Sequence, residues 1–348
     1  MPTSAVTLPT IDPTSIFELF RGSYGSELLT AAVCHFNVFE RLAKGPLSWT
    51  QLCNDLQLAP RSAHVLITAL RAFDLLTTNA DGDLSLTELA HEHLVPGAPF
   101  DVGDYIAAAA DSPGVQTMVQ CLRSNRPLGS DDETGVGFIY RNGIRSAMDT
   151  TSSARHFTLL LSGRAKNVAP ALAQRVSMNG VRKVLDVGGG TGIYTIALLQ
   201  KNPGLRGVVL DRPEVLKVAA EMAAAYGVAD RLELVGGDMF VDPLPQDCEV
   251  TLLSNILHDW DEPECQQLVN RCVAALPVDG RLLIHDVFLN DELDGPLPIA
   301  LYSAALFTVT EGRAYSAKEY RHWLTQAGLS PGEIMPTLIH CGVLSATK

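Results

Sequence analysis

Short apolar runs alternate with longer segments of helical periodicity from about residue 180 onward. Such runs predict strands, and strands separated by helices predict a mostly parallel sheet with helices on both faces. The runs that predict parallel strands are 184–187, 206–210, 232–235, 250–257 and 281–285. Two later runs, 332–338 and 341–346, follow a predicted helix at 317–327 and predict an antiparallel edge hairpin. The pattern therefore predicts an α/β fold with a doubly wound, Rossmann-like sheet.

The first hundred residues differ, because their apolar positions recur at helical spacing. The predicted helices span 16–36, 49–56 and 60–76. A polar turn at 79–83 then leads into a short apolar segment at 84–86, which would form the wing of a winged helix. A winged helix raises the alternative of DNA binding. The region carries more acidic than basic residues, however, and this disfavours contact with phosphates.

The residues between these regions predict further helices and one polar, glycine-containing loop. The helices are expected at 105–111, 138–147 and 154–176, and the loop at 128–135. The chain is therefore predicted to contain a winged-helix-like domain at 1–100, a helical linker at 101–175 and an α/β domain at 176–348.

Composition favours a soluble protein of the cytoplasm. The chain has 348 residues, enough for two domains, and a net charge of −13, which argues against nucleic acid or an anionic membrane as the main partner. Its seven scattered cysteines include no C-x-x-C pair, so reduced thiols are expected rather than disulfides or a zinc site. The amino terminus lacks a signal-peptide pattern, and no apolar run is long enough for a membrane span.

A glycine-rich turn follows the first predicted strand, in the run Val184 to Gly192. Its spacing is G-x-G-x-G, with Ile193 where a dinucleotide-binding turn would place its last glycine. Bare backbone in such a turn can lie against a ligand. Taken alone, the run is also consistent with an ordinary tight turn between a strand and a helix.

Acidic residues follow the next strands, at the sheet edge where open parallel sheets bind ligands. Asp211 ends the second strand, where a carboxylate can hold ribose hydroxyls. Asp238 follows the third strand and is succeeded by Met239 and Phe240, which suit the amino group and faces of adenine. Asp259 follows the fourth strand. One such acid could be a helix cap, but three in succession favour a nucleotide site.

The chain resembles the S-adenosylmethionine-dependent small-molecule O-methyltransferases, which include acetylserotonin, caffeate-type and bacterial secondary-metabolite enzymes. The resemblance rests on the motifs at 185–192, 211–215, 237–245 and 257–260, and covers most of the chain. It implies S-adenosyl-L-methionine as cofactor, S-adenosyl-L-homocysteine as product and a small-molecule acceptor. It also implies a homodimer formed through the N-terminal domain, without nucleic acid or membrane partners.

The resemblance also implies the residues of the site. The cofactor-binding residues are Asp186, Gly188, Gly190, Asp211, Gly237, Asp238, Met239, Phe240, Asn255, Ser162 and Tyr140. Asn255 falls where relatives often carry a basic residue near the methionine carboxylate. The substrate-pocket residues are Met148, Phe157, Leu161, Tyr302, Leu306 and Glu311, and no metal is expected. For the residues in the linker helices, packing in a helix core is the alternative role.

The chemistry needs a base, because the sulfonium methyl is already electrophilic and the acceptor hydroxyl must lose its proton. The resemblance places this base at His258 and its orienting acid at Asp286. Asp259 is predicted to cap the next helix, because Glu262 follows it at capping-box spacing. Relatives usually carry a second supporting Glu where this chain has Ala314. Asp286 alone, Glu311, Tyr315 or an undemanding acceptor could compensate.

The expected function is methyl transfer to an aromatic hydroxyl of a small secondary metabolite or pigment precursor. Ala314 leaves N- or C-methylation open as an alternative. A catalytically silent regulator that binds cofactor is another alternative. A nicotinamide oxidoreductase would share the sheet, but the glycine spacing argues against it.

Overall fold

The computed structural model describes residues 3–127, 148 and 151–348, which form two compact units. The sheet unit comprises residues 1–17, 131–288 and 317–348, and the helical unit comprises residues 18–130 and 289–316. Both units therefore combine segments that are distant along the chain. The sequence pattern, by contrast, predicted three contiguous domains.

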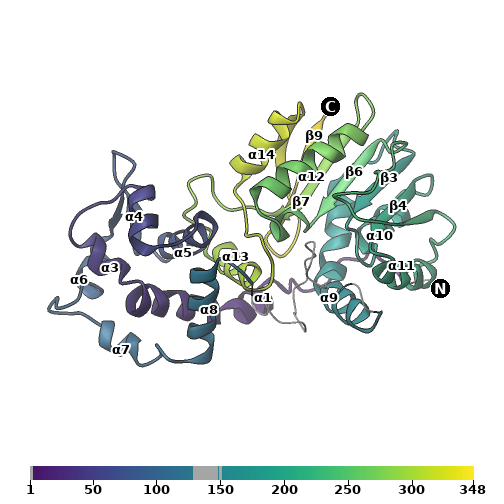
Figure 1. Cartoon of the computed structure of the whole chain (residues 1–348). Helices are drawn as coiled ribbons and strands as arrows, with labels where there is room; N and C mark the ends of the chain where they lie inside the picture. The colour runs from purple at the N-terminus through teal and green to yellow at the C-terminus, as the bar shows by residue number, and fades with distance from the viewer. Residues whose placement is uncertain (1–2, 128–147, 149–150) are drawn as a thin grey trace. The chain divides into compact units, whose positions relative to one another are not determined.

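The sheet unit is built on seven strands in the order β5-β4-β3-β6-β7-β9-β8 (Figure 1). The strands are β3 (Lys183–Val187), β4 (Arg206–Asp211), β5 (Leu232–Gly236), β6 (Val250–Ser254), β7 (Arg281–Val287), β8 (Ser330–Pro336) and β9 (Cys341–Thr347). The strands from β5 to β7 are parallel, as predicted. The side chains of β3, β4, β6 and β7 are mostly buried on both faces, which explains why these segments read as continuous apolar runs.

Helices connect these strands, and one long helix precedes them. They are α9 (Thr151–Arg175), α10 (Ile193–Lys201), α11 (Pro213–Ala225), α12 (Glu262–Ala275) and α14 (Ala317–Gln326), with a 3₁₀ turn at Leu257–Asp259. The chain runs outward from β3 through β4 to β5, and then in the opposite direction from β6 to β7. Right-handed crossovers therefore place α10 and α11 on one face and α12 on the other. The direction reverses between β3 and β6, the place where such sheets bind ligands.

The last two strands form the predicted antiparallel hairpin, with β9 lying between β7 and β8. Asp286 of β7 pairs with Gly342 of β9. A Cβ atom at Gly342 would lie 2.6 Å from Ile334 Cγ2, so a larger residue there would require Ile334 to shift.

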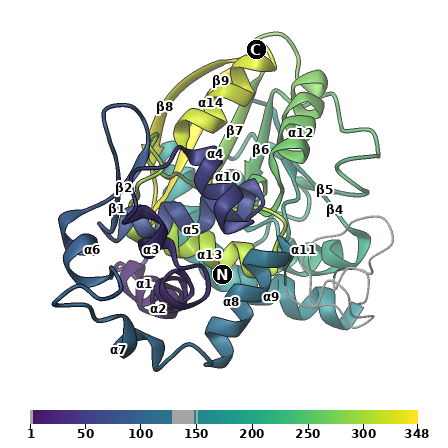
Figure 2. The same cartoon turned by 60° about the vertical axis from the view of Figure 1, so that its left-hand side comes forward.

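The helical unit contains most of the predicted N-terminal helices and a two-stranded hairpin (Figure 2). Its elements are α2 (Ser23–Thr30), a π-helix (Ala31–His35), α3 (Val38–Leu42), α4 (Trp49–Leu56), α5 (Pro60–Ala72), β1 (Leu76–Thr78), β2 (Leu84–Leu86), α6 (Glu88–His93), α7 (Gly103–Ala107), α8 (Pro113–Ser124) and α13 (Leu297–Val309). Ser48 caps α4 in a capping box with Gln51. The hairpin of β1 and β2 follows α5, as predicted for a wing.

The prediction of one continuous helix at 16–36 was wrong. Helix α1 (Thr14–Arg21) ends before Gly22, and the segment after α2 widens into a π-helix in which the Phe36 amide donates to the Ala31 carbonyl. Asn37 then turns the chain with a φ of 50°. Hydrophobic periodicity does not distinguish these local changes of pitch from one regular helix.

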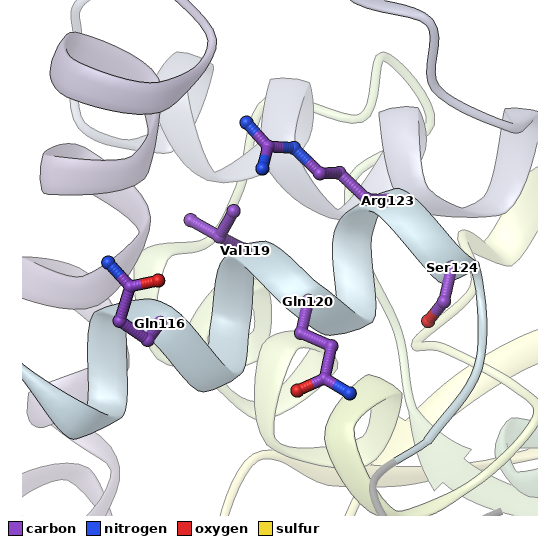
Figure 3. A pocket seen from close by; sticks show the side chains of 5 residues that line it. All are labelled: Gln116, Val119, Gln120, Arg123 and Ser124. Carbon is purple, nitrogen blue, oxygen red and sulfur yellow. The ribbon is translucent and has the colours of Figure 1, made fainter. Parts of the chain in front are cut away.

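The core of the helical unit gathers residues from both of its chain segments. Ala304 and Phe307 of α13 join the cluster formed by α2, α5 and α8. A shallow hollow also runs along one face of α8 (Figure 3), lined by Gln116, Val119, Gln120, Arg123 and Ser124. None of the predicted site residues lines it. Across the described parts of the chain, no helix combines the length and apolar character needed to cross a membrane.

Candidate active site

The glycine turn after β3 leaves bare backbone at the ligand-binding edge of the sheet. Gly188 has a φ of 69° and Gly190 a φ of 58°, values that L side chains rarely adopt. A Cβ atom at Gly188 would lie 2.5 Å from Ile256 Cδ1 and 3.8 Å from Met239 Sδ. A Cβ atom at Gly190 would meet no protein atom within 4 Å. The turn thus packs closely at Gly188 and opens onto free space at Gly190.

Asp186 lies beneath this turn and is fully buried. Its Oδ2 accepts a hydrogen bond of 2.8 Å from the Thr195 hydroxyl, while its Oδ1 has no hydrogen-bond partner among the described residues. Burial raises the pKa of Asp186 to about 7, and the nearby charge of Asp211 acts in the same direction. The carboxyl therefore has capacity to accept a further donor.

The Asp211 and Asp238 carboxylates each accept a hydrogen bond from a nearby backbone amide. Asp211 Oδ2 accepts from the Gly190 amide at 2.8 Å, which links the tip of β4 to the glycine turn. Burial raises the pKa of Asp211, although backbone hydrogen bonds oppose this. Asp238 Oδ1 accepts from the Phe240 amide at 2.8 Å, and its Oδ2 lies 3.3 Å from the Arg212 guanidinium.

The residues after β5 continue this edge. Gly237 donates its amide to the Asp211 carbonyl at 3.0 Å, and the Met239 carbonyl accepts from Arg271 Nε at 2.8 Å. The Phe240 ring meets Trp260 edge to face, with ring centres 4.6 Å apart. The structure thus brings the predicted residues after β3, β4 and β5 to one edge.

Asn255 follows β6 with a φ of 56° and contacts the long helix α9. Its Oδ1 accepts a 2.7 Å hydrogen bond from Arg164, and its Nδ2 donates to the Tyr194 hydroxyl at 3.2 Å. Arg164 was not predicted, and no motif marks it. It supplies a guanidinium where the sequence at position 255 has only an amide. Ser162, two residues earlier on α9, is buried and donates to the Leu159 carbonyl at 2.6 Å.

His258 and Asp286 form a buried pair between the turn after β6 and the strand β7. His258 Nδ1 donates to Asp286 Oδ1 over 2.5 Å, and the two residues are 3% and 1% exposed. Asp286 Oδ1 also accepts from the Val287 amide at 2.8 Å. Burial lowers the pKa of His258, but the Asp286 charge and hydrogen bond outweigh it, so that the pKa lies above its ordinary value.

The prediction that Asp259 caps helix α12 was wrong. The N-cap is Asp261, whose Oδ1 accepts from the Glu262 amide at 2.9 Å. Asp259 instead lies in the 3₁₀ turn with its Oδ1 3.7 Å from His258 Nε2. Burial raises the pKa of Asp259 to about 6. A short turn between β6 and α12 moves the cap by two residues, which the capping-box spacing does not reveal.

A family profile described as an O-methyltransferase domain matches residues 134–330. The chain belongs to this O-methyltransferase family. The methyltransferase is 34% identical over 320 residues to the 3-hydroxy-5-methyl-1-naphthoate 3-O-methyltransferase of Streptomyces sahachiroi, covering 91% of this chain and 90% of that protein. The predicted family is therefore confirmed.

Solved structures agree with the predicted α/β fold of the methyltransferase. An O-methyltransferase family 2 protein from Planctomyces limnophilus DSM 3776, in complex with apigenin, matches with a TM-score of 0.90 and 47% identity over 100% of this chain and 99% of that one. Human N-acetylserotonin methyltransferase, in complex with SAM, shares the fold with a TM-score of 0.60 and 21% identity, covering 98% and 99% of the two chains. A further structure of this fold, PigF with SAH, matches with a TM-score of 0.59 and 22% identity over 97% of this chain and 100% of that one.

The residues at the sheet edge of the methyltransferase fit S-adenosylmethionine, the cofactor that the resemblance implies. The open space over Gly190 admits a ligand against the backbone, and the buried Asp186 Oδ1 can accept a donor. Asp211 and Asp238 present carboxylates in the same region, as hydroxyl and amino groups of a nucleoside require. Among the described residues, no group of three or more His, Cys, Asp or Glu side chains could hold a metal ion.

The other predicted site residues fall in three places. Tyr140 lies outside the described residues. In the sheet unit, Met148 and Phe157 are half-buried, and Leu161 of α9 is 53% exposed. In the helical unit, Leu306 is buried, and the Tyr302 ring lies 3.6 Å from the Arg21 guanidinium carbon. Glu311, also in the helical unit, is half-buried, and the pocket role of all these residues stays a prediction.

Proposed function

We propose that the methyltransferase transfers a methyl group from S-adenosylmethionine to a phenolic hydroxyl of a small aromatic metabolite, with His258 as general base. The buried hydrogen bond between His258 Nδ1 and Asp286 Oδ1 is the observation that carries this proposal. It assigns the Nδ1 proton to the side of Asp286 and leaves Nε2 to accept a proton.

The cofactor, when bound, supplies an electrophilic methyl group. The backbone of Gly188 and Gly190 would lie against it, Asp211 would hold the ribose hydroxyls, and Asp238 would bind the adenine amino group. Arg164, held by Asn255, adds a positive charge that suits the methionine carboxylate. These roles agree with where the side chains lie on the sheet edge.

His258 removes the proton of the acceptor hydroxyl. A phenol has an ordinary pKa near 10, so a base with a pKa somewhat above that of free histidine, about 6.5, lessens the mismatch between the two groups. Asp286 keeps one imidazole tautomer in place and stabilises the imidazolium that forms, in the manner of a buried acid behind a catalytic histidine. The methyl acceptor thus loses its proton as its oxygen acquires the methyl group.

Two similar proteins support a phenolic acceptor. The named substrate of the Streptomyces sahachiroi enzyme carries a hydroxyl on an aromatic ring, and the 47% identical Planctomyces protein was crystallised with apigenin, which is a phenol. We also infer a cytoplasmic homodimer formed through the N-terminal region. Ile16, Leu19 and Phe20 of α1 support this, because each exposes an apolar side chain by more than half.

The test is incubation of the purified protein with S-adenosylmethionine and either apigenin or 3-hydroxy-5-methyl-1-naphthoate, followed by mass spectrometry and NMR of the product. An O-methyl ether is expected, and His258→Gln should abolish it while calorimetry shows unchanged binding of S-adenosylhomocysteine. His322→Gln changes an exposed histidine and is the matched control. Methylation of nitrogen or carbon, instead of oxygen, in a wider panel of small-molecule acceptors would refute the hydroxyl acceptor. Full activity of His258→Gln would refute the role of His258 as general base.

A further inference from the structure

A tyrosine of the C-terminal helix completes the buried acid–base pair. The Tyr320 hydroxyl, from α14, donates a 3.1 Å hydrogen bond to Asp286 Oδ2. Tyr320 is fully buried, as is Asp286 at 1% exposed. The sequence gives no sign of this contact, because Tyr320 reads as an apolar-face residue of an amphipathic helix.

Three donors bond to the Asp286 carboxylate, two of them at Oδ1 and one at Oδ2. Oδ1 accepts from His258 Nδ1 and from the Val287 amide, and Oδ2 accepts from Tyr320. A carboxylate can exchange its two oxygens by rotation about its terminal torsion, which is broad and two-fold. A donor fixed on Oδ2 holds Oδ1 toward the imidazole.

The packing of the Tyr320 ring makes its hydroxyl a fixed donor. Phe288 contacts the ring edge to face at 5.2 Å between centres, and Trp323 does the same at 5.4 Å. Phe288 also lies beside Gly342, the partner of Asp286 in β9. Removal of the hydroxyl alone therefore leaves the packing of the ring in place.

We propose that Tyr320 is a positioning residue for methyl transfer, which orients the Asp286 carboxylate and takes up part of its negative charge. This rests on the proposed role of His258 as general base. Tyr320 and Asp286 both belong to the sheet unit, so the hydrogen bond between them lies within one compact body.

The direction of the effect on His258 follows from the charge. A hydrogen bond from Tyr320 withdraws negative charge from Asp286, which weakens its attraction for the imidazolium. Tyr320→Phe should therefore raise the pKa of His258, by on the order of half a unit. The other charged groups that act on His258 are Asp259 in its own turn and Arg164 on α9, and both are retained in the variant.

The first experiment is an NMR titration of the histidine side chains in the ligand-free protein, with His258 assigned through His258→Gln. We expect the titration of His258 to move to higher pH in Tyr320→Phe and to stay in place in Tyr226→Phe, the matched control, which removes the hydroxyl of a buried tyrosine at the end of α11. An unchanged titration in both variants overturns the proposal. Should Tyr320→Phe not fold, Tyr320 is replaced by 3-fluorotyrosine, whose hydroxyl is a stronger hydrogen-bond donor. This replacement must move the titration of His258 to lower pH.

The second experiment is a double-mutant cycle in the apigenin assay. At pH about 6.5, Tyr320→Phe should lower kcat about two- to threefold, the loss of neutral imidazole that half a unit produces, with KM and cofactor affinity unchanged. In an Asp286→Asn background the same substitution should cause no further loss. An equal loss in both backgrounds would show that Tyr320 does not act through Asp286. Full activity of His258→Gln would instead refute the proposed base and leave the NMR result standing.

Discussion

Replacement of Gly190 by alanine tests the cofactor site most directly. The Gly190 backbone has a φ of 58°, and an added Cβ atom would meet no protein atom within 4 Å. The methyl group of Gly190→Ala therefore occupies space that the protein leaves open. If the cofactor lies against this backbone, the same methyl group must collide with it. Gly188 is a poorer probe, because its Cβ atom would press on Ile256 at 2.5 Å.

Gly190→Ala should change two free energies, that of folding and that of cofactor binding. A left-handed conformation costs a non-glycine residue about 1–2 kcal/mol, so the variant should lose that much folding stability. The amide of residue 190 still donates to Asp211 Oδ2, so no hydrogen bond is lost. A methyl group that displaces the cofactor from close contact should cost at least about 2.7 kcal/mol of binding, which is a hundredfold increase in Kd.

Gly180→Ala provides the matched control for this change. Gly180 has a φ of 76°, and its Cβ atom would also meet nothing within 4 Å, but it lies in the loop between α9 and β3. Calorimetry should find the same loss of stability in both variants, and titration with S-adenosylhomocysteine should find weakened binding only in Gly190→Ala. Equal affinities for S-adenosylhomocysteine in the two variants would refute the placement of the cofactor over Gly190.

Three further predictions concern the acids and the histidine. Asp286→Asn should lower kcat on the order of 10³-fold while calorimetry finds unchanged cofactor binding, because the imidazole loses its fixed tautomer; a loss below tenfold contradicts this role. Because the pKa of His258 is raised, the acidic limb of kcat/KM against pH should lie above about 6.5, and a limb below that value excludes His258 as the base. Burial raises the pKa of Asp186 from 3.8 to about 7, so the folded state binds the proton more tightly and stability should fall as pH rises between these values. The difference of about 3 units corresponds to at most about 4 kcal/mol, and urea unfolding of Asp186→Asn at several pH values should show this dependence removed.

The sheet could be predicted from the sequence because its strands are buried on both faces. Continuous apolar runs located β3, β4 and β7 closely, and the polar residues after each run marked the ligand-binding edge. The pairing of His258 with Asp286 was expected only through the family resemblance, since 28 residues separate them.

Two contacts of the site that the sequence does not predict depend on how elements meet in space. Tyr320 of α14 reaches Asp286 across 34 residues of the chain, and Arg164 of α9 reaches Asn255 across 91. Apolar periodicity does not encode such contacts. The cap at Asp261 and the π-helix at 31–35 depend instead on local backbone geometry, which several sequences near a helix end satisfy equally well.

The position of β9 inside the sheet has a consequence for biosynthesis. During translation β7 emerges from the ribosome well before residues 341–347, which form its second neighbour. Until then β7 offers an unpaired edge next to Asp286, and such edges invite association with other nascent chains. Chaperone protection in this interval should matter more for this protein than for one whose central strands pair in the order of synthesis.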